Sequence, residues 1–157
     1  MVVKVDTIRG LNSSGVIKAV CISKEKGTKK QNVRQVILQE NFGISNDAHA
    51  GSARQVSLLA EESIEKMQAK GLKVNYGDFA ENIVTSGVDL KNLPISTKIK
   101  IGDKVILRVT QIGKECHSRC AIYYQAGDCV MPREGIFAEV KKGGIVRTGD
   151  RIDILKI

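Results

Sequence analysis

Three of the four cysteines in this 157-residue chain lie close together in the sequence, at Cys116, Cys120 and Cys129. Cys116 follows an apolar segment and a glycine, so we expect it on a loop at a strand end, where functional side chains concentrate. Positive charge near a thiol lowers its pKa and favours the nucleophilic thiolate. Basic residues flank Cys116, and a single acid opposes them, in the segment GKECHSRC. The pattern predicts a reactive thiol at Cys116.

The same cluster admits a metal site, with the candidate ligands Cys116, His117, Cys120 and Cys129. Their spacing, C-H-x2-C-x8-C, departs from the paired C-x2-C of common zinc modules and from the spacings of iron–sulfur proteins. A reversible disulfide between two of the three thiols is another alternative. A chain of this length buries roughly 70% of its unfolded surface, so we expect that no metal is required for folding. Cys21 lies apart in an apolar segment and is expected to be a buried, structural cysteine.

A second polar group surrounds His49, one of only two histidines in the chain. Asp47 lies two residues before it and can orient its ring, a structural role that competes with a functional one. Arg54 begins an apolar segment, so its guanidinium must reach water, a carboxylate or a bound anion. The basic segment 24–30 is either a solvated surface or an anion-binding loop. The further candidate ligands for an anion are Lys29, Lys30 and Arg133.

The elements that would position these residues are mostly short strands. Segments rich in Val and Ile predict strands at 15–23, 33–39, 54–59, 98–101, 104–112, 144–148 and 151–155. The spacing of Ala60, Ile64 and Met67 predicts a helix at 61–70, which Gly71 would end. A second short helix is expected at 134–142, and Glu81 and Asn82 are expected to pin a turn. Many short strands, glycine turns and one or two short helices indicate a mainly β, barrel-like fold in a single domain.

Composition and charge exclude several classes of protein. Hydrophobic residues make up 42% and charged residues 27%, which is an ordinary globular composition. No apolar run approaches the roughly 20 residues of a membrane span, and the first residues lack the apolar core of a signal peptide, so we expect a cytoplasmic protein. The net charge of +8 suits an anionic partner or simply aids solubility. Aromatic residues make up only 4%, which disfavours a nucleic-acid binder.

Taken in order, five stretches of the chain resemble the small MOSC-domain proteins, a family named for the C-terminal part of molybdenum cofactor sulfurase. These stretches run from about residue 23 to residue 154 and read SKEKGTKK, DAHAGSARQVSLL, GDFAENI, IGDKVILRVTQIGKECH and GDCVMPREGIFAEV. The resemblance implies one MOSC domain over residues 1–157, with a mainly β, barrel-like core. The family often has glycine where this chain has Asn46; asparagine tolerates a positive φ, so we expect the turn to persist.

The resemblance also implies a function, namely binding of the molybdenum cofactor and transfer of sulfur carried on Cys116 as a persulfide. The residues that it places around the cofactor are Lys29, Lys30, Asp47, His49, Arg54, His117 and Arg133. The chain has no pyridoxal-phosphate domain, so the sulfur donor would be a separate protein such as a cysteine desulfurase, and the acceptor a molybdoenzyme. The alternative is a non-catalytic cofactor- or metal-binding module whose cysteines are ligands only. Whether the protein is an enzyme, a sulfurtransferase, stays open at this point.

Overall fold

Short segments rich in β-branched residues form strands here because such side chains pack well on a pleated surface. The structure is a computed structural model that describes residues 13–26, 28–113 and 134–155. The elements in the first half are β1 (Ser14–Ile22), β2 (Gln31–Val33), β3 (Gln35–Gln39), β4 (Gly43–Ile44), β5 (Val56–Ala60) and α2 (Glu61–Ala69). Those in the second half are β6 (Ile83–Ser86), β7 (Lys98–Ile101), β8 (Val105–Ile112), β9 (Ile136–Lys142), β10 (Gly144–Arg147) and β11 (Arg151–Ile154).

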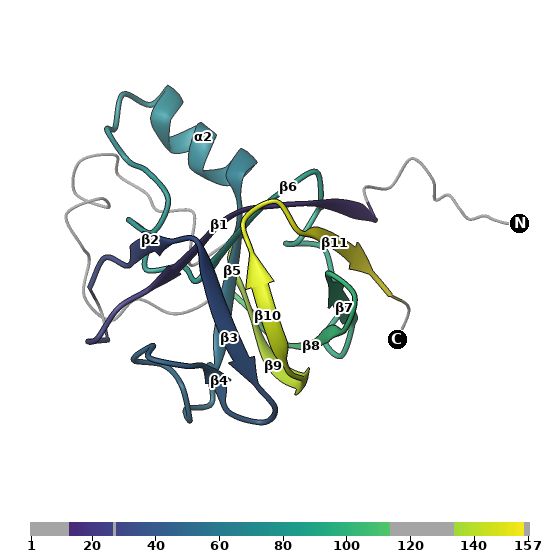
Figure 1. The fold of residues 1–157 in the computed structure, drawn as a ribbon. Helices are drawn as coiled ribbons and strands as arrows, with labels where there is room; N and C mark the ends of the chain where they lie inside the picture. Colours follow the sequence, from purple (N-terminus) through teal and green to yellow (C-terminus); the bar gives the residue numbers. More distant parts are fainter. Residues whose placement is uncertain (1–12, 27, 114–133, 156–157) are drawn as a thin grey trace, which may run out of the picture.

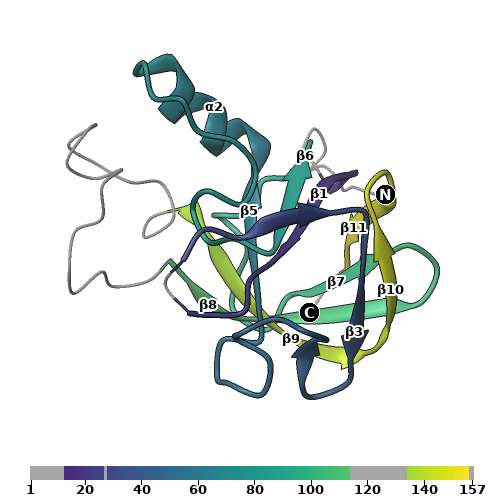
Figure 2. The same cartoon turned by 60° about the vertical axis from the view of Figure 1, so that its left-hand side comes forward.

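Seven of these strands close into a barrel, in the order β11, β7, β8, β9, β5, β6 and β1, with β1 pairing back onto β11 (Figures 1 and 2). The mainly β, barrel-like fold expected from the sequence is thereby confirmed. β2 extends the sheet beyond the end of β1. The pair β5–β6 is parallel, and α2 lies in the crossover between them, as parallel neighbours require.

A second sheet of three strands, in the order β10, β3 and β4, packs on the barrel. β3 alternates between exposed and buried residues, and its buried Val36 and Leu38 join the same apolar cluster as the barrel interior. Ile37, on the other face, is 50% exposed beside its partner Ile145. The small sheet therefore covers the barrel with one face and meets solvent with the other.

Helix α2 confirms the helix expected at 61–70, and Gly71 follows it with φ +92°. Its buried Ile64 and Met67 belong to a second apolar cluster, which includes Leu59 of β5 and Val84 of β6. The helix therefore packs on the outside of the barrel wall, away from the larger core (Figure 1). In the part of the chain that the structure describes, no helix is long and apolar enough to cross a membrane.

Two expectations about local structure differ from the observed elements. The short helix expected at 134–142 is wrong, because residues Ile136–Lys142 form strand β9. β9 has hydrogen-bonding partners on both sides, β8 and β5, and this pairing outweighs the helix propensity of its Ala, Glu and Lys residues. The single strand expected at 33–39 is divided at Arg34 into β2 and β3, which belong to different sheets.

Candidate functional site

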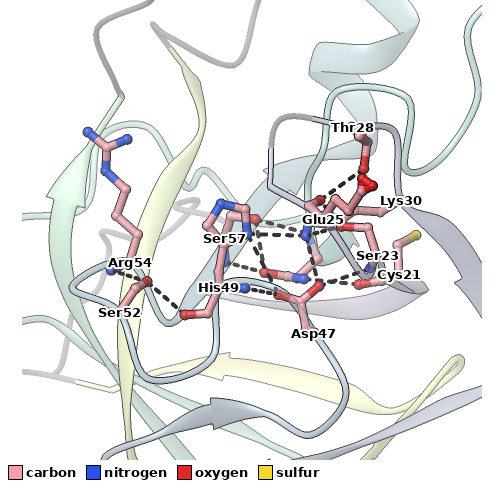
Figure 3. Close-up of polar contacts among 11 residues, drawn as sticks. Cys21, Ser23, Glu25, Thr28, Lys30, Asp47, His49, Ser52, Arg54 and Ser57 are labelled. Atoms are coloured by element: carbon pink, nitrogen blue, oxygen red, sulfur yellow. Dashed lines mark hydrogen bonds and ion pairs between the residues drawn. The ribbon is translucent and has the colours of Figure 1, made fainter.

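The loop after β4 folds back onto the end of β1 through the carboxylate of Asp47. Oδ1 of Asp47 accepts hydrogen bonds from the backbone N–H of Ser23 at 3.1 Å and from Nζ of Lys30 at 2.8 Å. Oδ2 accepts the backbone N–H of His49 at 3.1 Å. The side chains of Lys30 and Asp47 are both fully buried. One buried ion pair thus ties three loop segments together (Figure 3).

The ammonium group of Lys30 is fully used inside this cluster. Besides Asp47, its Nζ contacts Oγ of Ser23 at 3.0 Å and Nδ1 of His49 at 3.2 Å. Lysine can only donate, so Nδ1 of His49 accepts, and the proton of the neutral ring is assigned to Nε2. The ring is 22% exposed, and its Nε2 has no hydrogen-bond partner among the described residues. The cluster therefore sets the tautomer of His49 and leaves one ring N–H to face a ligand or solvent.

The environment of Asp47 favours its charged form. Burial acts to raise the pKa of the carboxyl group, but the hydrogen bonds that it accepts outweigh burial; these come from the Lys30 ammonium group and from the backbone N–H groups of Ser23 and His49. The net effect is a pKa below the ordinary value, so Asp47 is ionised at neutral pH. The turn before it forms as expected, because Asn46 adopts a positive φ of +70°.

Arg54 lies just before β5, and its guanidinium reaches toward the end of β8. Nε donates to Oε1 of Gln111 at 3.4 Å, and the guanidinium stacks over the ring of Phe137 at 5.2 Å. Nε2 of Gln111 in turn donates to the carbonyl of Gly113 at 2.8 Å. In the described part of the chain, the two terminal nitrogens of Arg54 have no hydrogen-bond partner. Figure 3 shows the Arg54 side chain standing apart from the Lys30–Asp47–His49 cluster.

Lys29, unlike its neighbour Lys30, is exposed. It lines a surface pocket of about 420 Å³ together with Lys24, Thr28 and Asn46. Lysine, threonine and asparagine side chains all donate hydrogen bonds, and one acid, Glu25, is also present. The basic segment therefore divides into a buried lysine that organises the loops and exposed lysines that are free to meet an anion.

The turn at residues 77–82 holds the backbone of Lys30 in place. Gly77 accepts the N–H of Lys30 at 2.8 Å, and a Cβ at Gly77 would lie 2.0 Å from the carbonyl oxygen of Lys30. Its φ of +89° also requires glycine. The fully buried carboxylate of Glu81 accepts the N–H groups of Gly77 and Phe79 at 2.9 and 3.0 Å. The expectation that Glu81 pins this turn is confirmed.

Asn82 fastens the same turn to the barrel. Its Nδ2 donates to the carbonyl of Cys21 in β1 at 3.0 Å, and its Oδ1 accepts the N–H of Ser57 in β5 at 3.0 Å. The hydroxyl of Ser57 donates to the same Oδ1 at 3.1 Å. Cys21 itself is fully buried, which confirms the structural role expected for it. The site loops are thus attached to rigid strands.

The buried Glu81 predicts a pH dependence of stability. Burial raises the pKa of Glu81 from 4.5 to about 7, the N–H bonds that it accepts lower the pKa, and Asp78 raises it. Because the folded state binds the proton on Glu81 more tightly than the unfolded state, the stabilisation from this group is fully present below pH 4.5 and is lost as pH rises toward 7. We expect the contribution of Glu81 to the free energy of unfolding to decrease by roughly 3 kcal/mol between pH 4.5 and 7.

The matching variant is Glu81→Gln, which cannot titrate. Urea unfolding at several pH values should show a shallower fall in stability between pH 4.5 and 7 for this variant than for the wild type, whatever its absolute stability. Equal slopes for the two proteins over that window would contradict the assignment to Glu81.

The remaining candidates from the sequence lie outside the described residues, namely Cys116, His117, Cys120, Cys129 and Arg133. The barrel nevertheless marks where their segment begins and ends, because the N–H of Gly113 donates to the carbonyl of Gly135 at 2.6 Å. Within the described ranges, no group of three or more His, Cys, Asp or Glu residues could hold a metal ion.

Two polar residues of the site escaped the sequence analysis. Gln111 links Arg54 to the end of β8, and Ser57 links Asn82 to β5. Ser57 lies within the otherwise apolar strand β5, and Gln111 continues the row of alternate, inward-facing positions Val105, Leu107 and Val109 of β8. The signal that could have found them is therefore a polar residue at a position expected to be buried. Of the predicted residues, the structure brings Lys30, Asp47 and His49 into direct contact and places Arg54 and Lys29 outside that contact network.

Comparisons with known proteins agree with this fold. The sequence profile of the MOSC domain matches residues 45–153, which include the Asp47–Arg54 loop. The YuaD protein of Bacillus subtilis superposes with a TM-score of 0.77 at 17% identity, over 92% of this chain and 97% of that one. YiiM from Geobacillus stearothermophilus gives 0.66 at 14% identity, over 90% and 75% of the two chains. YiiM from Escherichia coli gives 0.64 at 15% identity, over 92% and 70%.

At identities of 14–17%, the likeness to the solved structures shows the fold alone. The MOSC profile matches more than half of the chain and therefore shows the family. No curated protein matches the chain.

Proposed function

Because the chain belongs to the MOSC-domain family, whose members are associated with the molybdenum cofactor, we propose that it binds this cofactor and carries sulfur on Cys116. The protein is then a sulfur carrier in cofactor maturation. The choice of cofactor rests on the family to which the chain belongs. The candidate ligands and the reactive thiol are residues of this chain.

The observation that carries the proposal is the chain of contacts from Arg54 through Gln111 to Gly113. It brings the half-buried guanidinium of Arg54, whose two terminal nitrogens have no partner among the described residues, toward Gly113, three positions before Cys116 in the sequence. Arginine binds phosphate with paired hydrogen bonds from its planar group. A phosphorylated ligand held by Arg54 would therefore lie close to Gly113, three positions before Cys116 in the sequence.

The donor set of the described loops fits the phosphate of a pterin cofactor. Arg54 offers two guanidinium nitrogens that have no partner among the described residues, Lys29 and Lys24 offer exposed ammonium groups, and His49 offers an oriented Nε2–H. When bound, the cofactor would supply a soft, dithiolene-held metal to which sulfur can be delivered. Lys30 and Asp47 contribute by orienting His49 and holding the loops, because their charges are already paired. His117 and Arg133 complete the proposed ligand set.

Loading of sulfur onto Cys116 needs only a thiolate and a donor persulfide. The thiolate of Cys116 attacks the outer sulfur of a donor R–S–SH, forming a new S–S bond while the bond to the donor breaks and the donor leaves as R–S⁻. The proton stays on the transferred sulfur, and no net oxidant is consumed. The donor would be a separate protein, such as a pyridoxal-phosphate-dependent cysteine desulfurase, and the recipient a molybdoenzyme.

The test of the function uses the protein purified anaerobically from its native host. We expect its intact mass to exceed the sequence mass by one sulfur atom, and this extra mass should disappear on reduction. The same preparation should contain bound pterin and molybdenum. A protein that carries cofactor but never sulfur would instead be the non-catalytic binding module. A protein that carries neither under these conditions would contradict both functions.

Arg54 provides the matched test of the binding geometry. We expect Arg54→Ala to lower the affinity for the cofactor by roughly 10- to 100-fold, because a charge-assisted hydrogen bond contributes about 1.5–3 kcal/mol. Arg54→Lys should retain part of the affinity, since the charge remains but the planar fork is lost. Anaerobic titration with the isolated cofactor measures the effect.

The control for charge alone is Arg151→Ala, because Arg151 is exposed and pairs with Asp153 at 2.9 Å on the far strand β11. Equal affinities of the Arg54→Ala and Arg151→Ala variants would remove Arg54 from the site.

A further inference from the structure

A second basic pocket, of about 660 Å³, lies where β1, the β2–β3 junction and the β10–β11 turn meet. β3 and β10, which form one wall, lie side by side in both views (Figures 1 and 2). Three of its seven lining residues are cations, Lys18, Arg34 and Arg147, and none is acidic. We call this the basic pocket; it shares no lining residue with the pocket at Lys29.

The backbone that carries these three cations is held by hydrogen bonds between the strands. The N–H of Thr148 donates to the carbonyl of Arg34 at 3.2 Å, and the N–H of Gly149 donates to the carbonyl of Ile17 at 2.8 Å. Arg147 is also in register with Gln35 across the β10–β3 pair. The three charged side chains therefore project from a framework whose geometry is set before any ligand arrives.

Lys18 occupies a break in the regular pairing of β1 with β6. Ile17 pairs with Thr85 and Ala19 pairs with Val84, so Lys18 is the extra residue of a β-bulge. A bulge redirects the side chain of the inserted residue and leaves it out of the ladder. Here the redirected side chain is one of the three cations that line the basic pocket.

None of the three cations has a side-chain hydrogen bond or ion pair with any residue that the structure describes. Other arginines of the barrel do have partners, as Arg108 pairs with Glu139 at 3.2 Å. The carboxylate of Asp150 is nearby, but its Oδ2 accepts the backbone N–H of Arg147 and lies against Gly102. Like charges thus line one pocket without a counterion among the residues that the structure describes, an arrangement that an anionic ligand would stabilise.

We propose that the basic pocket binds a small oligophosphate, that is, a molecule bearing a pyrophosphate group. Two guanidinium forks and one ammonium match a compact, multiply charged anion with many oxygen acceptors. Thr148, Asn32 and Gln35 add neutral hydrogen-bond donors to the lining. No aromatic side chain lines the pocket, so it lacks the stacking platform that a single-stranded nucleic acid requires.

The basic pocket and the proposed cofactor site use different charged residues. Lys18, Arg34 and Arg147 are not among the ligands proposed for the cofactor, although Asn32 of the basic pocket pairs with Cys21, two positions before Ser23 of the Asp47 cluster. The proposal therefore stands or fails independently of the sulfur-carrier function.

The experiment is calorimetric titration of the intact protein with pyrophosphate, at low salt. We expect the double variant Arg34→Ala/Arg147→Ala to bind at least tenfold more weakly than the wild type, because it loses two charged donors at about 1.5–3 kcal/mol each. Arg34 and Arg147 are exposed, so the variant should fold, and circular dichroism and thermal unfolding verify that it does.

The matched control is Lys73→Ala/Lys98→Ala, which lowers the net charge equally at exposed positions away from the basic pocket. We expect it to bind pyrophosphate nearly as well as the wild type. Three outcomes would overturn the proposal: no binding by the wild type, equal weakening in both double variants, or tighter binding of a single-stranded oligonucleotide than of pyrophosphate at the basic pocket.

Discussion

Replacing Lys30 with methionine should lower the free energy of unfolding by about 3–5 kcal/mol. Methionine keeps the length of the side chain but removes the charge, which leaves the carboxylate of Asp47 buried without its cation. The backbone N–H bonds from Ser23 and His49 remain and do not compensate for that loss. Urea unfolding at neutral pH measures the change.

The neighbouring variant Lys29→Met is the control, since it removes the same charge from an exposed side chain and should cost no more than about 0.5 kcal/mol. The double variant Lys30→Met/Asp47→Asn should be more stable than the sum of its single changes, because neither charge is then left unpaired. If Lys30→Met and Lys29→Met unfold at the same urea concentration, the buried pair contributes nothing.

The same pair has a pH signature. The pKa of Asp47 is lowered in the folded protein, so its stabilisation is present above the ordinary carboxyl pKa near 3.8 and disappears as pH falls below that value. In Lys30→Met the pKa should return toward the ordinary range, and the fall in stability below pH 4 should become shallower.

Replacing Cys116 with serine should abolish sulfur loading, because serine cannot form a persulfide. Cys120→Ser and Cys129→Ser should still load sulfur and differ only in how readily a reductant or an acceptor discharges it. Intact mass after incubation with a persulfide donor measures both. Loading that survives in Cys116→Ser would exclude Cys116 as the carrier.

Selective alkylation provides a second readout on the same variants. Cys21 should not compete for a limiting reagent, because burial, reinforced by Glu81 and only partly offset by Lys30, raises the pKa of its thiol to about 12. A Cys21→Ala variant should therefore load sulfur normally. At neutral pH we expect Cys116 to react before Cys120 and Cys129, since attack requires a thiolate that is also accessible; equal labelling of the three would contradict its special role.

Local sequence patterns predicted individual helices and strands of the barrel better than features that depend on which strands pair. The helix at 61–70 and the strand at 104–112 were predictable because their apolar spacing is regular and a glycine or a turn bounds each. Strand β9 was not, because Ala, Glu and Lys in its sequence favour a helix when the two neighbouring strands are ignored. The division at Arg34 also depends on contacts distant in sequence, since β2 and β3 pair with different partners.

In the candidate site, too, contacts between distant segments decide which side chains are buried, and the local sequence does not predict them. Segment 24–30 presents several lysines that are equivalent in the sequence, yet only Lys30 is buried against Asp47. What distinguishes it is the close approach of Gly77 to its backbone, which no local pattern contains. The pinning roles of Glu81 and Asn82 were predictable, because polar side chains in a turn that begins with a glycine commonly bond to nearby backbone groups.

The pairing of β1 with β11 joins residues from opposite ends of the described chain. During synthesis the N-terminal strands therefore emerge from the ribosome long before the strand that closes the barrel exists. Until β11 is available, the edge of β1 opposite β6 is open at Ser14–Val16, and an open strand edge can pair with other chains. Non-local pairing of this kind also slows folding, because a long loop must close before its contacts form. The nascent protein is thus most exposed to aggregation just before translation of residues 151–154, and chaperone protection would matter most at that stage.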